Sequence, residues 1–289
     1  MSGNTNIEIK HIIVPFDFST ASQNALQHAI AIAKNTRADI TLLSVMDSYS
    51  SQALQHRSGK FADFEEMAFE KLDEYAKQVL TFNKIESKVS ETKWSRAVAE
   101  LANHRSGALL VLGVGGKNRD GFFDASHAYR IVDSLNVPLL AVRENQQVSN
   151  YKTIITPLDE DQHSREKLPY VTLLASAFDA KVSVIGLQTH GGQESTTHMQ
   201  AIMNQASHYI QMKVKQYQDK LISSKNEVGD IVKHASEEKA DLLVIMSAHE
   251  KSLANLFSSP YAQQVSDKST TPVLICPTRV SMVMGNVSI

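Results

Sequence analysis

The chain has 289 residues and a formal net charge of −2, from 29 Lys and Arg residues against 31 Asp and Glu residues. Residues 1–146 carry 16 basic and 17 acidic residues, so neither half has the basic excess typical of nucleic-acid-binding proteins. No apolar run reaches the roughly 18 residues of a membrane span, and the polar opening MSGNTNIEIK does not resemble a signal peptide. A single cysteine, Cys276, cannot form an intrachain disulfide and fits a reducing compartment. We therefore expect a cytoplasmic protein without nucleic acid or membrane partners, and a buried Cys276.

The first half alternates short β-branched runs with helical periodicity, a pattern typical of a parallel sheet covered by helices. The pattern predicts five strands, at 11–15, 40–45, 85–92, 109–112 and 138–142. It also predicts four helices, at 20–33, 61–82, 95–104 and 125–135. Either Ser19 or Thr20 is expected to cap the first helix, since both side chains can accept a hydrogen bond from a free backbone N–H.

The second half repeats the first. The segment that begins at Ile12 recurs from Ile154, an offset of 142 residues without a gap, and ALLVLGVGG at 108–116 matches DLLVIMSAH at 241–249. Further strands are predicted at 217–223, 242–246 and 272–276, and helices at 195–213, 227–238 and 260–269. We therefore expect two doubly wound α/β domains, at 1–146 and 150–279, with a short polar join and a C-terminal tail at 280–289.

Candidate ligand-binding residues lie at the carboxyl ends of the strands, where open α/β sheets bind their ligands. Asp17 follows the first strand, and its carboxylate can accept hydrogen bonds from a ribose or adenine group or can brace the next helix. The residues alone leave both interpretations open. After the fourth strand, Gly113 and Gly116 allow backbone N–H groups to approach an anion, and Ser126 begins a helix whose positive end favours phosphate.

The chain resembles a tandem universal stress protein, because its sequence motifs follow one another in the same order. VPFDFS, LLSV, LLVLGVGG and VPLLAV match that family in order, and the likeness covers almost the whole chain. The resemblance implies two flavodoxin-like (adenine nucleotide alpha hydrolase-like) domains, each a five-stranded parallel sheet with helices on both faces. It also implies a site for ATP or a related adenine nucleotide, with or without Mg, in the N-terminal domain only. The residues that would line it are Pro15, Phe16, Asp17, Val45, Leu112, Gly113, Gly116, Ala125, Ser126 and His127.

The first half departs from the family's phosphate-binding pattern. Nucleotide-binding members carry Gly-x2-Gly-x9-Gly-Ser/Thr after the fourth strand, whereas this half is one residue shorter and has Ala125 at the third glycine. The Cβ of Ala125 restricts the backbone at that point.

The second half keeps the spacing of that pattern but changes every important residue. Met246 and His249 replace the first two glycines, and Pro260 removes both a hydroxyl and an N–H. The acidic segment after Asp159 would also repel an anion. We therefore expect no nucleotide in this half.

The resemblance implies a stress-response protein whose C-terminal domain is a scaffold or regulator with an unknown protein partner. We assign no catalytic residue and no metal ligand, and expect no enzyme, with slow ATP hydrolysis left open. One alternative is a nucleotide-free adaptor whose two pockets are both degenerate. Another is an enzyme that uses His249 and Asp159 on a small ligand. By resemblance, residues 138–143 and 272–277 pair across an interface and make the chain an intrachain pseudo-dimer, and a further homodimer remains open.

Overall fold

The computed structural model describes residues 7–17, 19–45, 70, 85–90, 94–103, 105–114, 137–147, 150–189, 192–247 and 261–278. The described elements of the first half are β1 (His11–Pro15), α1 (Thr20–Thr36), β2 (Asp39–Val45), β3 (Ile85–Ser90), α4 (Trp94–Asn103), β4 (Ala108–Val114) and β5 (Leu139–Arg143). Those of the second half are β6 (Thr153–Leu158), the 3₁₀ helix η1 (Gln162–Arg165), α6 (Leu168–Phe178), β7 (Lys181–Gln188), α7 (Gln193–Gln211), β8 (Tyr217–Ser223), α8 (Glu227–Glu237), β9 (Leu242–Met246), α9 (Tyr261–Lys268) and β10 (Val273–Cys276).

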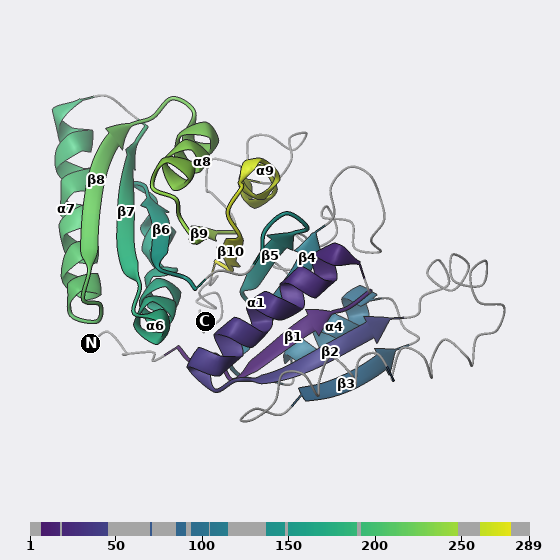
Figure 1. The fold of residues 1–289 in the computed structure, drawn as a ribbon. Coiled ribbons are helices and arrows are strands. Elements are labelled where there is room, and N and C mark those ends of the chain that lie inside the picture. The colour runs from purple at the N-terminus through teal and green to yellow at the C-terminus, as the bar shows by residue number, and fades with distance from the viewer. Residues whose placement is uncertain are drawn as a thin grey trace, which may run out of the picture.

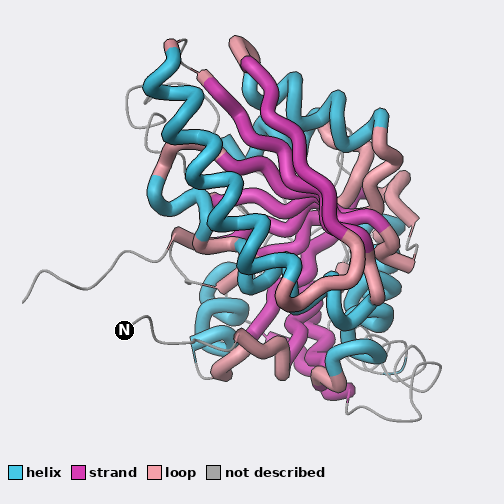
Figure 2. The backbone as a smooth tube through the Cα atoms, turned by 90° about the vertical axis from the view of Figure 1, so that its left-hand side faces the viewer, coloured by secondary structure: helices cyan, strands magenta, loops and turns pink. Residues whose placement is uncertain are grey.

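These strands form one twisted sheet of ten strands with helices on both faces (Figures 1 and 2). The order is β3-β2-β1-β4-β5-β10-β9-β6-β7-β8, so each half has the doubly wound order that the sequence predicts. Helices α1, α6 and α7 cover one face, and α4, α8 and α9 cover the other. Where the predicted elements fall on described residues, their boundaries agree with the structure to within three residues. The helix predicted at 125–135 and the tail at 280–289 lie outside the described residues, and so does the helix predicted at 61–82 except for Glu70, which is helical.

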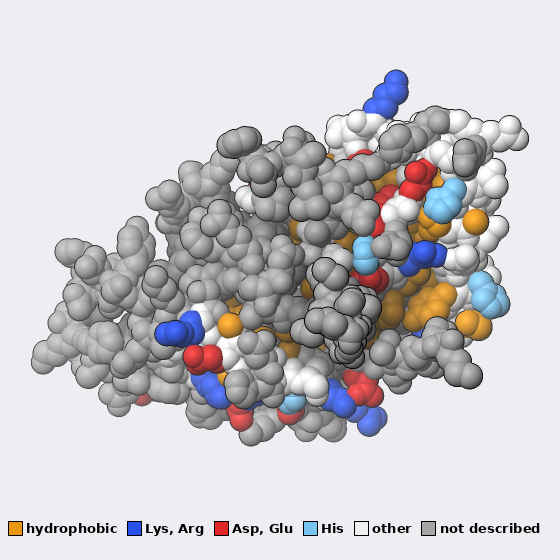
Figure 3. Space-filling view, turned by 180° about the vertical axis from the view of Figure 1, so that it is seen from behind, with side chains coloured by type: hydrophobic (Ala, Val, Ile, Leu, Met, Phe, Trp, Pro, Cys, Tyr) orange, Lys and Arg blue, Asp and Glu red, His pale blue; other side chains and the backbone are white. Residues whose placement is uncertain are grey.

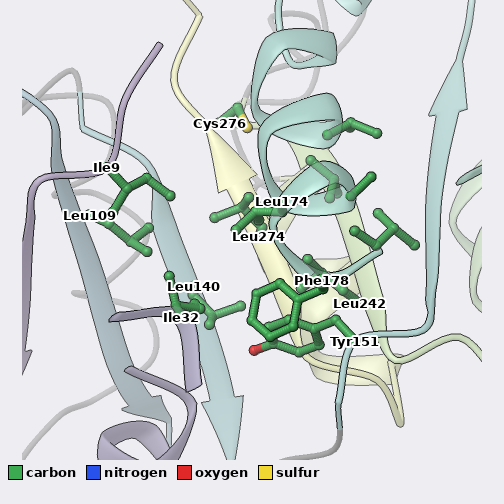
Figure 4. Close-up of a cluster of buried hydrophobic side chains, with 14 of the residues drawn as sticks. Ile9, Ile32, Leu109, Leu140, Tyr151, Leu174, Phe178, Leu242, Leu274 and Cys276 are labelled. Carbon is green, nitrogen blue, oxygen red and sulfur yellow. The ribbon is translucent and has the colours of Figure 1, made fainter. Parts of the chain in front are cut away.

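The two halves meet through their last strands, as expected. Strands β5 and β10 pair antiparallel, with Leu140 opposite Leu274, while both strands run parallel to their inner neighbours β4 and β9. The hydrophobic core continues across this junction, where Leu140 and Leu274 lie close to Tyr151 and Phe178 (Figure 4). The rings of Tyr151 and Phe178 meet edge to face, with centroids 4.9 Å apart. The halves are therefore joined by a shared sheet and a shared core.

Polar contacts also connect the halves. The Arg143 guanidinium at the end of β5 donates hydrogen bonds to the carbonyl oxygens of Ser266 and Asp267, in the last turn of α9. The Gln146 side chain donates to the Ser269 carbonyl at 3.3 Å. The last carbonyls of a helix lack partners within it, so Arg143 satisfies acceptors that the fold leaves open.

We expect Arg143→Met to lower the free energy of unfolding by about 1–2 kcal/mol, because a charged donor to the α9 carbonyls is lost. Urea unfolding followed by circular dichroism measures this loss. Arg37→Met, which changes an exposed side chain at the C-terminal end of α1, is the matched control and should stay within about 0.5 kcal/mol of the parent. Equal losses in the two variants would contradict a specific role for Arg143.

The first helix begins differently in the two halves. Helix α1 begins at Thr20, and the side chain of Ser19 caps it by accepting a hydrogen bond from the Ser22 N–H at 3.2 Å. With the offset of 142, Thr20 corresponds to Gln162, yet the chain there forms η1, and α6 begins only at Leu168. Pro169 lies in the first turn of α6. Inside a longer helix its ring would clash with the Arg165 carbonyl and remove a hydrogen bond, whereas in the first turn it is tolerated.

Candidate functional site

The predicted ligand-binding edge of the first half is formed by three neighbouring parallel strands. Strand β1 pairs with both β2 and β4, and the Phe16 N–H donates to the Leu43 carbonyl at 2.9 Å, so their carboxyl ends meet. Six of the ten predicted site residues are described and lie at this edge, in the strands or directly after β1: Pro15, Phe16, Asp17, Val45, Leu112 and Gly113. The other four, Gly116, Ala125, Ser126 and His127, lie outside the described residues.

Asp17 braces the start of α1. Its Oδ1 accepts hydrogen bonds from the Ser19 N–H at 3.0 Å and from the Ser19 hydroxyl at 2.5 Å. Asp159 does the same in the second half, where its Oδ1 accepts from the Asp161 N–H at 2.9 Å. The bracing role that the sequence allowed for Asp17 is therefore confirmed, and Asp159 makes the equivalent contact at η1 in the second half. A contact between Asp17 and a nucleotide stays a prediction.

Two further predicted site residues, Phe16 and Leu112, have buried side chains that are 1% and 0% exposed. Phe16 packs in the core beneath α1, and Leu112 packs on the opposite face of the sheet. Since these side chains are used by the core, the residues present main-chain groups at the edge of the sheet.

Gly113 lies inside β4, which extends two residues beyond the predicted strand end, to Val114. A Cβ on Gly113 would lie 2.4 Å from the Ala21 carbonyl carbon and 2.5 Å from the Ser22 nitrogen. Glycine at this position therefore lets the first turn of α1 pack directly against the end of β4. The positive N-terminal end of α1 is thereby held at the ligand-binding edge, where it favours an anion.

The second half has Met246 where the first has Gly113. A first helical turn as close as that of α1 would collide with this side chain, and η1 and the late start of α6 replace that turn. A small cavity of about 20 Å³ remains at this edge, enough for one water molecule. It is lined by Pro157, Asp159, Asp161, Ser164, Lys167, Met246 and Tyr261.

Lys167 fills much of this region with a side chain that is 2% exposed. With the offset of 142 it corresponds to Ala25, a buried residue of α1. Its Nζ donates to the Ser164 carbonyl oxygen and lies 3.4 Å from the Ser164 hydroxyl oxygen. Burial lowers the pKa of Lys167 to about 8, while the neighbouring Asp159, Cys276 and Asp161 side chains oppose this shift.

Cys276 and Tyr261 share this environment. Burial raises the pKa of the Cys276 thiol to about 12, with Lys167 opposing, which fits the buried structural cysteine that the sequence predicts. Burial also raises the pKa of Tyr261, and Asp159 and Glu227 add to the effect. Both groups are therefore neutral at physiological pH.

Ser164 and Lys167 were not predicted as site residues, because their segment stands out in the sequence only as acidic. The sequence feature that could have revealed this pair is the Ser-x-x-Lys spacing, because side chains three residues apart lie on the same side of a tight helical turn. Two other residues predicted to alter this pocket, His249 and Pro260, lie outside the described residues.

Within the described ranges, no helix is long and apolar enough to cross a membrane. In the same ranges, no three His, Cys, Asp or Glu side chains gather as a metal site would require. The described charged side chains on the face in Figure 3 are mixed in sign, with Lys and Arg beside Asp and Glu.

Comparison with known proteins gives two kinds of match. The model of the universal stress protein family matches twice, over residues 8–143 and 150–277. A universal stress protein from Archaeoglobus fulgidus DSM 4304 superimposes with a TM-score of 0.70 and 15% identity, covering 93% of this chain and 98% of that one. A protein called functionally unknown, from Pseudomonas aeruginosa PAO1, gives a TM-score of 0.58 and 15% identity over 95% of each chain.

A universal stress protein in complex with cAMP matches 45% of this chain and 99% of its own, at 23% identity and a TM-score of 0.40. None of the curated proteins matches this chain.

Proposed function

Because the chain belongs to the universal stress protein family, we propose that it is a stress-response protein whose N-terminal half binds ATP or a related adenine nucleotide, with or without Mg²⁺. The C-terminal half binds no nucleotide and is a scaffold or regulator. The protein acts in the cytoplasm through a protein partner, without rapid turnover of the nucleotide. The two halves correspond to domains at 1–146 and 150–279, followed by a tail at 280–289.

The difference between Gly113 and Met246 is the observation that supports this proposal most directly. In the first half, Gly113 permits the N-terminal end of α1 to lie against β4, beside the Asp17 carboxylate. A nucleotide there would have its phosphates near the positive end of α1 and its ribose near a carboxylate. In the second half, Met246 and the buried Lys167 occupy the corresponding space and leave about 20 Å³.

The scaffold role of the second half is supported by its contacts with the first. Strand β10 completes the sheet beside β5, and Tyr151 packs in the core shared by the halves. An intrachain pseudo-dimer of this kind needs no second chain to cover the edges of β5 and β10.

Calorimetric titration with ATP, in the presence and absence of Mg²⁺, tests the proposal. We expect saturable binding of about one nucleotide per chain. Asp17→Asn should weaken binding by about tenfold or more, because a charge-assisted hydrogen bond of about 1.5–3 kcal/mol is lost. The amide oxygen of the variant can still accept from Ser19 and preserve the start of α1.

Asp159→Asn is the matched control in the second half, where it should leave ATP affinity unchanged. At an ATP concentration 100 times the dissociation constant, the parent should also gain about 2.7 kcal/mol of stability. If millimolar ATP gives no heat and no stabilisation, the nucleotide proposal is wrong, and the nucleotide-free adaptor is favoured. If Asp159→Asn weakens binding and Asp17→Asn does not, the site lies in the other half.

A further inference from the structure

In the second half, the geometry points to Ser164 as a nucleophile and Lys167 as its general base, a pair that accepts a small acyl group such as acetyl from an activated ester or acyl phosphate. This inference goes beyond the proposed nucleotide site and does not depend on it. The two residues lie at the carboxyl ends of β6 and β9, across the sheet from the edge that we assign to nucleotide.

The local fold brings the two side chains together. Ser164 lies in η1, which ends at Arg165, and Lys167 is the N-cap residue of α6; the helical backbone angles of Glu166 and Lys167 carry the turn on, so the Lys167 side chain returns to Ser164. The Lys167 Nζ lies 3.4 Å from the Ser164 Oγ. This distance is within the range seen between a nucleophile and its base before a substrate binds.

A second contact orients the hydroxyl group. The Asp159 N–H donates a hydrogen bond to the Ser164 Oγ at 3.1 Å. This bond uses a lone pair of the oxygen and leaves its proton available for transfer to Nζ. It also stabilises the negative charge that develops on Oγ as the proton leaves.

The surroundings of Lys167 keep its amine available as a base. The groups that face it are the carboxylates of Asp159 and Asp161, the thiol of Cys276 and the phenol of Tyr261. Burial outweighs the two carboxylates and lowers the pKa of Lys167 to about 8, so a useful fraction of the amine is neutral near physiological pH.

The fold itself does not require a lysine at this position. In the first half the corresponding residue is Ala25, which is also buried, and α1 forms there without any charged group. A buried amine costs free energy unless it is well paired. Lys167 is paired with the Ser164 carbonyl and faces the carboxylates of Asp159 and Asp161, and it lies beside a serine hydroxyl at a position where the other half has no charged group, which supports a chemical role.

The proposed reaction is a simple acyl transfer. The Ser164 Oγ attacks the carbonyl carbon of the donor and forms a new C–O bond, while its proton moves to the Lys167 Nζ. The bond from that carbon to the leaving group then breaks, and the leaving group departs with the electron pair. The products are O-acyl-Ser164 and the free leaving group. The cavity of about 20 Å³ has room for little more than one water molecule, so the donor must be small at its reacting end, the acyl group must displace neighbouring side-chain atoms, and the leaving group stays outside.

Reaction of the full-length protein with p-nitrophenyl acetate tests the inference. We expect release of one equivalent of p-nitrophenolate and peptide mass spectrometry that locates one acetyl group on Ser164. The rate should rise with pH, with a midpoint near 8, because the neutral form of Lys167 is the base. Ser164→Ala should remove the modification, and Lys167→Arg should slow it by at least about 100-fold, since a guanidinium stays protonated.

Ser247→Ala is the matched control. Ser247 follows β9 and is also buried, and its Oγ likewise accepts a backbone hydrogen bond, from the Thr278 N–H at 3.4 Å, but among the described residues no lysine amine bonds to it. This variant should react like the parent, and thermal melting checks that every variant is folded. Acetyl on Lys167 itself, acetyl on no residue of this pocket, or an unchanged rate in folded Lys167→Arg would each overturn the inference. The location of acetyl in the parent protein decides the matter even where a variant does not fold.

Discussion

We expect Gly113→Ala to lower the free energy of unfolding by about 3 kcal/mol, although it adds only one methyl group. The new Cβ would lie 2.4 Å from the Ala21 carbonyl carbon and 2.5 Å from the Ser22 nitrogen, closer than van der Waals contact allows. Both atoms belong to the backbone of the first turn of α1, so no side-chain rotation can relieve the overlap. The whole helix start must shift, which places the loss at the upper end of the range for overpacked cores. Urea unfolding followed by circular dichroism measures it.

Gly186→Ala is the matched control, because Gly186 also lies in a buried strand. Its added Cβ would meet the Met203 Sδ at 2.9 Å and the Leu221 Cδ1 at 3.0 Å, which are the ends of flexible side chains. These ends can rotate away, and we expect a loss below about 1 kcal/mol. If the two variants lose the same stability, the close approach of α1 to β4 is not the reason that this position needs glycine.

Strand positions and the junction between the halves could be predicted from the sequence with good accuracy. The ranges predicted for β8 and β9 agree with the structure at both ends, because short apolar or alternating runs are bounded there by polar residues. The pairing of β5 with β10 followed from the family resemblance and from the unprotected edges of these strands. Of the two residues expected to cap the first helix, Ser19 and Thr20, Ser19 is the cap.

The start of α6 could not be predicted from the repeat. An ungapped alignment favours equal helices in both halves, whereas Pro169 and Met246 change the path of the chain without changing its length. The role of Gly113 was also ambiguous, because a glycine at a strand end can admit a ligand or a helix, and only the distance to Ala21 distinguishes the two. Lys167 was missed for a related reason. Charge counting treats a lysine as solvated, and its burial depends on tertiary contacts that no local pattern contains.

Acid should destabilise the protein through His28. This side chain is 0% exposed, and it connects the halves: its Nδ1 lies 2.6 Å from the Tyr151 hydroxyl and its Nε2 lies 3.2 Å from the Gln146 carbonyl oxygen. A carbonyl oxygen can only accept, so Nε2 carries the proton and Nδ1 accepts from the tyrosine. The contacts therefore fit a neutral imidazole and oppose a second proton.

Burial lowers the pKa of His28 from 6.5 to about 4. Between these two pH values the unfolded chain binds a proton that the folded chain does not, so the free energy of unfolding falls as the pH drops from 6.5 to 4. The contribution of His28 is fully present above pH 6.5, and about 3 kcal/mol is lost once the pH is below 4. Urea unfolding at a series of pH values between 4 and 7.5 measures the slope.

His28→Gln should flatten this part of the pH profile, whatever it does to the stability at neutral pH, because the titrating group is gone. His198→Gln is the matched control, since His198 lies exposed on α7, and its profile should keep the slope of the parent. The comparison depends on slopes rather than on absolute stability, so a general loss of packing in the His28 variant does not disturb it. Parallel profiles for the parent and His28→Gln would mean that another group causes the acid sensitivity. A flattened profile would show that the contact between α1 and the second half weakens when His28 takes up a proton.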